Sequence, residues 1–458
     1  MLTRSPRRGL SRARRNAHAA RKREAPLRAE LFGVEQLARH AEAIARRHRL
    51  SEGRGSTRLL AQLGRNEEIL RAFNRATLAV DKERRVTPAA EWLLDNFYLI
   101  EEQIQLARRH LPRGYSRELP RLANDGADGW LRVYELVLEL IAHVDAQIDA
   151  ESLTAFIAAY QKVAALKLGE LWAVPIMLRL GLIENLARIA TALARERADR
   201  NLARTWVDRL EETAEKNPSQ LVIVVAEMAQ SELPLSSSFV AEFCQRLRLN
   251  PVLHIARGWL EQRLSEQGLS VEQLVREESQ SQASDQVSVS HSISSLRSLS
   301  AINWREFVET LSLVEQQLRG EPADVYADMD FATRDHYRHI VEMLARGSGL
   351  AEVEIARRAV TLAEENARQK GREDRSAHVG FFLIDKGRRQ LERTATVRWS
   401  WRKLLEHSIR RFPFAFYVGG IVLLTAAATF AFARAAQVFA VPGWVINFCT
   451  VTFMLGMS

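Results

Sequence analysis

The sequence predicts an all-α protein: a multi-helix cytoplasmic region followed by a C-terminal transmembrane helical hairpin whose second span is truncated. Three observations predict this class. Apolar residues recur at spacings of three and four over most of residues 33–411, which is typical of amphipathic helices. Glycine is sparse, at 22 of 458 residues, and the polar stretches lack strand-like alternation. A long charge-free apolar stretch lies near the C-terminus.

Length and composition set the broad class. A chain of 458 residues is long enough for two or three domains. With 47% hydrophobic and 26% charged residues, most of the chain can bury a core, which excludes global disorder. The two cysteines, Cys244 and Cys449, cannot alone build a disulfide framework or a zinc site.

Residues 1–32 are expected to form a basic disordered arm. The first 23 residues hold nine basic side chains and no acidic one, whereas the other 435 carry 56 of each. The net charge of +9 therefore belongs to the arm, and no nucleic-acid partner is expected. A transit peptide, or a tail attracted to anionic lipid or nucleic acid, remains an alternative for this arm. A secretory signal peptide is excluded, because no apolar run follows the basic residues.

Residues 33–276 are expected to form a helical domain. Leu93, Phe97, Ile100 and Ile104 follow helical spacing. Further helices are expected at 130–148, 151–166, 170–198 and 200–216, with turns at 112–114 and 124–126. The apolar run 221–225 could be a strand by composition, but the Ala-Glu-Met-Ala that follows favours a buried helix.

A serine-rich linker leading into a helix is expected at 277–300. Residues 279–300 contain ten serines in 22 positions, a composition typical of flexible linkers. We expect a loop over 277–290 and a helix thereafter, where Ile293, Leu296 and Leu299 take helical spacing. A second helical block, 301–411, then includes a helix at 302–318.

Residues 412–458 are expected to form a transmembrane hairpin. The 22 residues from Phe412 to Ala433 carry no charge and, as a helix, would cross a hydrocarbon core about 30 Å thick. Aromatic residues and Arg410 and Arg411 flank its start. A buried helix of a soluble domain is the alternative. The basic residues before the span place residues 1–411 in the cytoplasm.

The second span is short. Pro442 and Gly443 break the apolar stretch after Arg434, and 15 residues from Trp444 to Ser458 fall short of the ~20 that a span needs. We therefore expect this sequence to be the front part of a longer polypeptide.

Two groups of side chains are candidates for metal chemistry. Asp328 and Asp330 have the Asp-x-Asp spacing by which sugar-nucleotide transferases hold a divalent ion, but the pattern opens a helix, where an N-cap is the plainer role. His336 and His339, with Asp335 and Glu342 nearby, could share a helix face, although such pairs usually lie on solvated surface.

Paired acids offer no clear active site. Glu101 and Glu102, like Glu91 and Asp95, are better explained as a salt-bridged helix surface. The sequence contains no phosphate-binding glycine loop, no nucleophile elbow and no HExxH. We therefore assign no catalytic, cofactor-binding or metal residue and expect no cofactor in this chain.

Several segments resemble, in order, the N-terminal region of bacterial cyclic β-1,2-glucan synthases. They run from residue 92 toward the apolar C-terminal stretch and comprise Trp92–Gln103, Leu111–Tyr115, Leu119–Pro120, Gly169–Pro175, Ile183–Leu186, Ser294–Arg297, Trp304, Tyr326–Asp335, Tyr337–Arg338, His378–Gly380 and Leu383–Ile384.

The resemblance implies part of a large inner-membrane enzyme that polymerises glucose from UDP-glucose through β-1,2 links and closes the chain into a ring. In that family, the glycosyltransferase domain and the glycoside-hydrolase-like and phosphorylase-like domains come later than the last residue here, so no catalytic residue is carried over. The neutral helical body and the approach to the bilayer through Arg388–Arg411 suggest a scaffold that packs on the transferase domain and holds it at the membrane. Its expected partners are membrane lipid and those missing domains.

Two other classes stay open. A membrane-anchored interaction protein would function as the 458-residue chain alone. A helical enzyme with a dispersed site would turn over UDP-glucose when purified.

Overall fold

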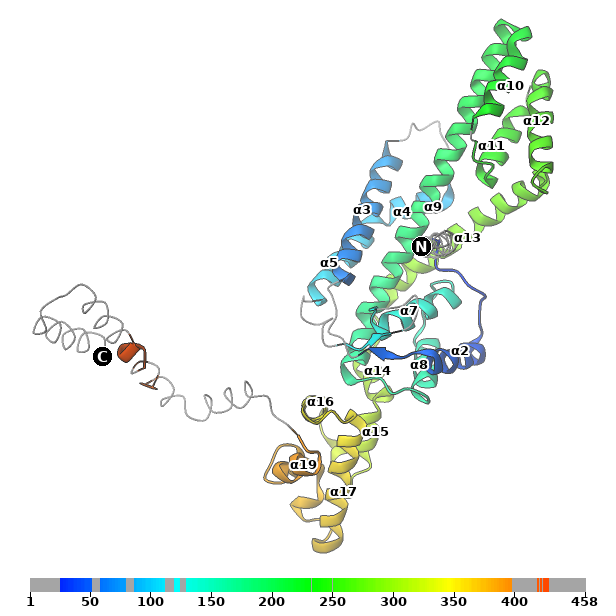
Figure 1. Cartoon of the computed structure of the whole chain (residues 1–458). Helices are drawn as coiled ribbons and strands as arrows, with labels where there is room; N and C mark the ends of the chain where they lie inside the picture. The colour runs from blue at the N-terminus through cyan, green and yellow to red at the C-terminus, as the bar shows by residue number, and fades with distance from the viewer. Residues whose placement is uncertain are drawn as a thin grey trace, which may run out of the picture. The chain divides into compact units, whose positions relative to one another are not determined.

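The computed structural model describes residues 25–51, 58–79, 86–111, 119–123, 129–231, 233–248, 250–397 and, within 418–427, all but 420 and 422 (Figure 1). The chain divides into two compact units, residues 1–313 and 314–458. In the described residues, helices are joined by short connections and one two-stranded antiparallel pair. The all-α prediction is confirmed.

The first unit contains most of the helices and the strand pair. The helices are α2 (Val34–Arg47), α3 (Arg58–Leu78), α4 (Pro88–Asp95), α5 (Phe97–His110), α7 (Arg132–His143), α8 (Ala150–Gln161), α9 (Leu168–Lys216), α10 (Leu221–Gln230), α11 (Ser237–Leu247), α12 (His254–Ser265), α13 (Val271–Ser298) and α14 (Trp304–Leu311). Strand β1 (Leu50–Ser51) pairs with β2 (Arg121–Leu122), so that Leu50 faces Leu122.

Helix α9 is the axis of the first unit. It runs unbroken for 49 residues, so the two helices expected at 170–198 and 200–216 are one. Its first half is buried against α3, α5, α7, α13 and α14. Its second half contributes Ala203, Val207 and Leu210 to a separate core shared with α10, α11 and α12, which gather around that end of the helix (Figure 1).

The apolar run 221–225 is helical, as predicted. It opens α10, where Leu221, Val224, Val225 and Met228 are buried at one helical spacing. Val222 and Ile223, on the other side, are 60% and 58% exposed. An amphipathic helix presents one apolar stripe to the core that it covers, here the core shared by α9, α10, α11 and α12, which explains why only part of this run is buried.

The prediction of a loop over residues 277–290 is wrong, because this segment is helical. Helix α13 begins at Val271, after an N-cap in which the Ser270 hydroxyl accepts from the Gln273 amide at 3.2 Å, and continues through the serine-rich segment. Val289, Ile293 and Leu296 are buried on one face. Ser288, Ser292 and Ser295 lie buried beside them and hydrogen-bond to other elements. Serine suits a flexible linker in water, but here buried partners satisfy the hydroxyls, so the segment stays helical.

The second unit is a smaller helical assembly. It contains α15 (Leu313–Arg319), which starts at the boundary, α16 (Phe331–Ser348), α17 (Glu352–Lys370), α18 (Val379–Leu383) and α19 (Arg388–Thr394), with 3-10 turns at Tyr326–Asp328 and Arg375–Ala377. The helix expected at 302–318 is two helices, α14 and α15.

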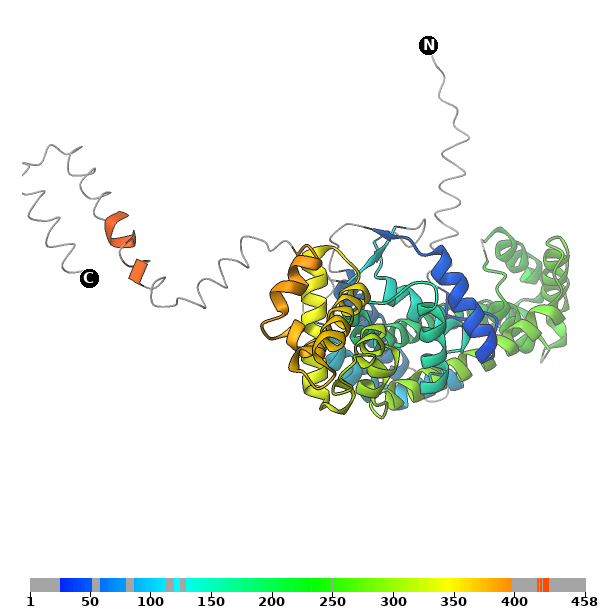
Figure 2. The same ribbon diagram turned by 90° about the horizontal axis from the view of Figure 1, so that it is seen from below.

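A glycine turn joins the two longest helices of the second unit. Gly349 ends α16 in the left-handed conformation, with φ of 73°, which lets the chain reverse into α17. The short helices α18 and α19 pack on α17 (Figure 2). Among the described residues, the buried apolar core of this unit comes from residues 314–395.

Several predictions fall on residues outside the described ranges. These are residues 1–24 of the disordered arm expected over 1–32, the turns at 112–114 and 124–126, and most of the hairpin at 412–458. For residues 25–32 the prediction of disorder is wrong, because this segment is bonded to the first unit. Arg28 pairs with Asp285 of α13 at 2.6 Å, and the amides of Ala29 and Phe32 donate to carbonyls at the end of α7. Where residues 418–427 are described, they are helical. Among the described residues, no helix combines the length and the apolar character needed to cross a bilayer.

Candidate functional site

Within each unit, buried polar side chains connect the helices of that unit. Many of these side chains lie in the segments that carry the family resemblance. In α9, the fully buried carboxylate of Glu170 accepts from Arg132 of α7, with Nε 2.8 Å from Oε1. The Arg132 guanidinium also donates to the Ala165 carbonyl at 3.0 Å. Since a buried charge is costly unless it is paired and hydrogen-bonded, this pair fixes α7 against the start of α9.

The next polar residues of α9 connect it to three other segments. Glu184 accepts from the Tyr134 hydroxyl and, at 3.0 Å, from Arg188 Nε. Burial and the neighbouring Glu184 carboxylate raise the pKa of Tyr134 well above its usual value. Asn185 accepts from the Leu27 amide at 2.8 Å and donates to Ser292 of α13 at 3.1 Å. One turn of α9 therefore positions α7, α13 and the chain before α2.

In the second unit, Glu315 is the centre of a buried ionic cluster. Its carboxylate accepts from the Tyr326 hydroxyl at 2.7 Å and from the fully buried Arg338 guanidinium at 2.5 Å. Arg334 and Arg319 add contacts at 3.2 and 2.9 Å. Burial opposes ionisation of Glu315, but these hydrogen bonds and the Arg338 charge outweigh it and hold the pKa below its usual value.

A second buried carboxylate, Glu321, joins residues far apart in the sequence. It accepts from His378 Nδ1 at 2.7 Å and from the backbone amides of Val379 at 2.7 Å and Tyr326 at 2.6 Å. Burial disfavours the charge, yet these donors lower the Glu321 pKa. A Cβ built on Gly380 would clash with the Tyr337 hydroxyl, so this close approach requires glycine.

Glu321, His378 and Tyr337 form a carboxylate–imidazole–hydroxyl chain, the order used in acyl-transfer catalysis. The Tyr337 hydroxyl lies 3.4 Å from His378 Nε2, a long contact. Burial and the Glu321 charge raise the Tyr337 pKa, so the hydroxyl stays protonated near neutral pH. Because the Glu321 carboxylate is held by backbone amides as well, the arrangement positions the 3-10 turn against α18.

The residues expected from sequence as metal candidates take plainer roles. Asp330 is the N-cap of α16 and accepts from the Thr333 amide at 2.9 Å, as predicted. Asp328 lies exposed in the preceding 3-10 turn. His336 and His339 are exposed on α16, and His339 Nδ1 donates to the Asp335 carbonyl at 2.9 Å.

The remaining sequence candidates lie in ordinary surroundings. Glu101 forms a surface ion pair with Arg71 of α3 at 3.2 Å, which confirms the salt-bridge interpretation for this residue, although the partner is not on the same helix. Cys244 is a buried free cysteine of α11, and burial raises the pKa of its thiol to about 11. Such a thiol is a poor nucleophile.

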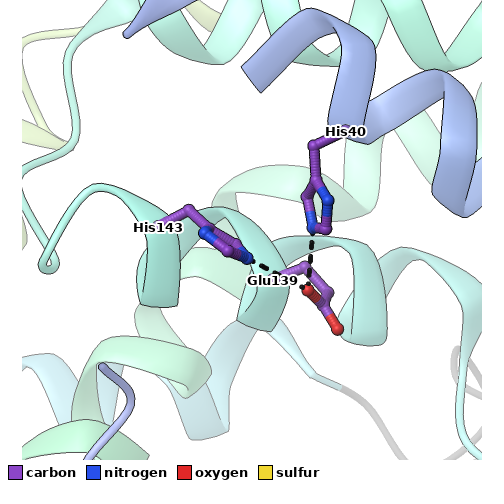
Figure 3. A group of neighbouring side chains, drawn as sticks. All are labelled: His40, Glu139 and His143. Atoms are coloured by element: carbon purple, nitrogen blue, oxygen red, sulfur yellow. Dashed lines mark hydrogen bonds and ion pairs between the residues drawn. The ribbon is translucent and has the colours of Figure 1, made fainter. Parts of the chain in front are cut away.

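Sequence reasoning missed a cluster of two histidines and a carboxylate. His40 of α2 meets Glu139 and His143 of α7, and one potential ligand atom from each lies within 4.8 Å of the others (Figure 3). Glu139 and His143 stand four residues apart, a spacing that places both on one helix face. That spacing was the available signal, but His40 is 99 residues from Glu139, so no local pattern could include it.

Comparison with known proteins gives two findings. No family model matches the chain. The cyclic β-(1,2)-glucan synthase NdvB of Rhizobium meliloti (strain 1021) is 34% identical over 362 residues, which cover 78% of this chain and 12% of that protein. This chain is homologous to a segment of a cyclic β-1,2-glucan synthase.

The homology confirms the resemblance predicted from the sequence motifs. The chain matches only a small part of the synthase's length. In this synthase-related segment, the motif residues Glu170, Glu184, Asn185 and Tyr326 are the buried polar connections described above. The motifs therefore mark positions where polar groups hold helices together.

Proposed function

We propose that this chain serves as the N-terminal helical scaffold of a cyclic β-1,2-glucan synthase, holding the glucan-forming domains of that enzyme at the membrane. The observation that carries the proposal is homology over 78% of a chain whose described residues pack into two helical units. The buried charged residues of these units pair with one another, Arg132 with Glu170 and Arg338 with Glu315, and their side chains are shielded from solvent.

The buried carboxylates argue for a structural role. Glu315 and Glu321 have fully buried side chains, and each accepts several hydrogen bonds from within the unit. A general acid or base needs a face open to substrate and a pKa near the working pH. The pKa values of both carboxylates are lowered, which favours permanently charged anchors for helices.

Membrane anchoring is the second part of the proposal. The charge-free segment 412–433 follows a basic cluster that includes Arg410 and Arg411, which favours a cytoplasmic location for residues 1–411. Leu423 and Leu424, in the described part of this segment, are 71% and 69% exposed. Exposed leucines in an uncharged helix suit contact with lipid. In this scheme the partners are inner-membrane lipid and the transferase and later domains.

The test removes the scaffold from a complete enzyme. In the R. meliloti synthase, the stretch homologous to this chain is deleted, and cyclic glucan is measured in cells and in isolated membranes. We expect glucan production to fall at least tenfold. The matched control replaces the same stretch with the homologous part of this chain, and we expect it to retain synthesis. Unchanged synthesis by the deletion would refute the proposal.

Two further outcomes separate the alternatives. The purified 458-residue chain is incubated with UDP-glucose, and we expect no turnover; glucose transfer would show an enzyme in its own right. Membrane flotation of the chain with and without residues 398–458 tests anchoring. If both versions float equally, the proposed span is not the anchor.

A further inference from the structure

We propose that His40, Glu139 and His143 form a binding site for one divalent transition-metal ion of the zinc class. Two imidazoles and one carboxylate are a common protein ligand set for such an ion, with water completing a tetrahedron. The ligands come from two helices, and Figure 3 shows both imidazoles directed at the Glu139 carboxylate.

The spacing of the ligand atoms fits a tetrahedral ion. Bonds of about 2.0–2.1 Å to nitrogen and oxygen separate neighbouring ligand atoms by about 3.3 Å. Nε2 of His40 lies 3.1 Å from Glu139 Oε2, and Nε2 of His143 lies 3.7 Å from the same oxygen. The ligand nitrogens of the two histidines lie within 4.8 Å of one another, so the side chains must draw closer together to enclose an ion.

The His143 ring is oriented as metal-bound imidazoles usually are. Its Nδ1 donates to the Glu30 carbonyl at 2.7 Å, which leaves the Nε2 lone pair facing the cluster. Phe32 stacks on the ring, with centroids 4.1 Å apart and planes 10° apart. Backbone and aromatic contacts thus fix both the tautomer and the plane of the ring.

The three ligand groups converge on one point. Nε2 of His40 and Nε2 of His143 both face Oε2 of Glu139, so a cation between them would contact two imidazole nitrogens and one carboxylate oxygen. Metal binding needs imidazole nitrogens that carry no proton, so binding should weaken as the pH falls.

Accessibility is also suitable. The side chains of His40, Glu139 and His143 are 20%, 36% and 11% exposed. The ligands are shielded enough to be held in place, while the carboxylate side remains open for ion entry and a bound water. An ion here would link α2 to α7.

The test uses the purified 458-residue chain after dialysis against a chelator. Titration with Co²⁺ is followed by visible absorption, and Zn²⁺ is then added in competition. We expect one Co²⁺ per chain with the intense absorption of a tetrahedral site, displaced by Zn²⁺. His143→Ala and Glu139→Gln should each weaken binding about 100-fold or more, because each removes a ligand. His336→Ala/His339→Ala is the control and should bind normally.

Several results would overturn the proposal. The site does not exist if the wild-type chain takes up no ion, or if Glu139→Gln, which preserves side-chain size, binds as well as the wild type. Loss of binding in the His336 and His339 control alone would assign the ion to that exposed pair. A pH-dependent melting temperature that Zn²⁺ does not change would mean that a proton, and not a metal, occupies the cluster.

Discussion

Buried and half-buried glutamates in this molecule differ in what surrounds the carboxylate. Glu170 and Glu315 each face arginine, and their charge is matched. Glu196 of α9 lies near two other acids: burial first, and then Glu278 and Asp285, raise its pKa to about 7, although Arg200 opposes the shift. A carboxyl that holds its proton up to neutral pH makes stability depend on pH.

Glu196→Gln should remove that dependence. The folded-state pKa of about 7 exceeds the ordinary glutamate pKa of 4.5. The contribution of Glu196 to stability is therefore complete below about 4.5 and is lost as the pH rises through 7. At pH 8 the variant should be more stable than the wild type by about 2 kcal/mol, with little difference at pH 4.5. Urea unfolding at both pH values checks this.

The matched control is Glu261→Gln, at an exposed glutamate paired with Arg257 on α12. We expect it to leave the pH dependence unchanged. Equal slopes of stability against pH for the wild type and Glu196→Gln would show that Glu196 ionises normally in the folded chain.

At the scale of elements, α13 shows that the same residue type serves two purposes along one helix. Ser279 is exposed and donates only to the Val275 carbonyl of its own helix, at 3.1 Å. Ser292 is fully buried and accepts from Asn185 of α9 at 3.1 Å. Ser295 donates to the Ala146 carbonyl at 2.7 Å. The buried serines therefore join α13 to elements about 100–150 residues away.

Ser292→Ala should destabilise the first unit by about 1–2 kcal/mol, because it removes an acceptor from the buried Asn185 amide. Ser279→Ala, on the exposed face of the same helix, should be neutral or slightly stabilising, since alanine has the higher helix propensity. Chemical denaturation of the two variants measures the contrast. A similar effect at both positions would mean that intrinsic propensity, and not the buried bond, decides the stability of α13.

At the scale of the whole molecule, the two units have separate cores. Residues 314–395 supply the core of the second unit. Among the described residues, the two cores of the first unit contain none of these residues. Each unit also has its own buried ion pair, Arg132–Glu170 in the first and Arg338–Glu315 in the second. Unfolding of the chain should therefore not follow a single two-state transition.

Arg338→Met should destabilise the second unit by about 3 kcal/mol or more, because it leaves Glu315 buried with a weaker set of partners. Arg132→Met should do the same to the first unit through Glu170. Amide hydrogen exchange followed by mass spectrometry locates the effect. We expect lost protection in residues 314–397 for the former and in residues 129–231 for the latter. Equal loss across both units for either variant would contradict separate cores.

The sequence by itself determined the helical class, the position of most helices and the relationship to a glucan synthase. Helices such as α5 and α10 are encoded in the spacing of their own apolar residues, so a local pattern suffices. The N-cap at Asp330 was likewise predictable, because its partner lies three residues away. The membrane hairpin remains a prediction from composition.

Tertiary structure decided what the polar residues do. The serine-rich segment is helical because Asn185 and Ala146 meet its hydroxyls, and composition contains no record of these partners. Glu321 meets His378 across 57 positions of sequence, and Glu139 meets His40 across 99. An apolar side chain needs only a buried environment, whereas a hydrogen bond needs a particular partner at a particular distance. The local sequence pattern therefore specifies which apolar side chains are buried, whereas only the folded chain specifies which polar groups are hydrogen-bond partners.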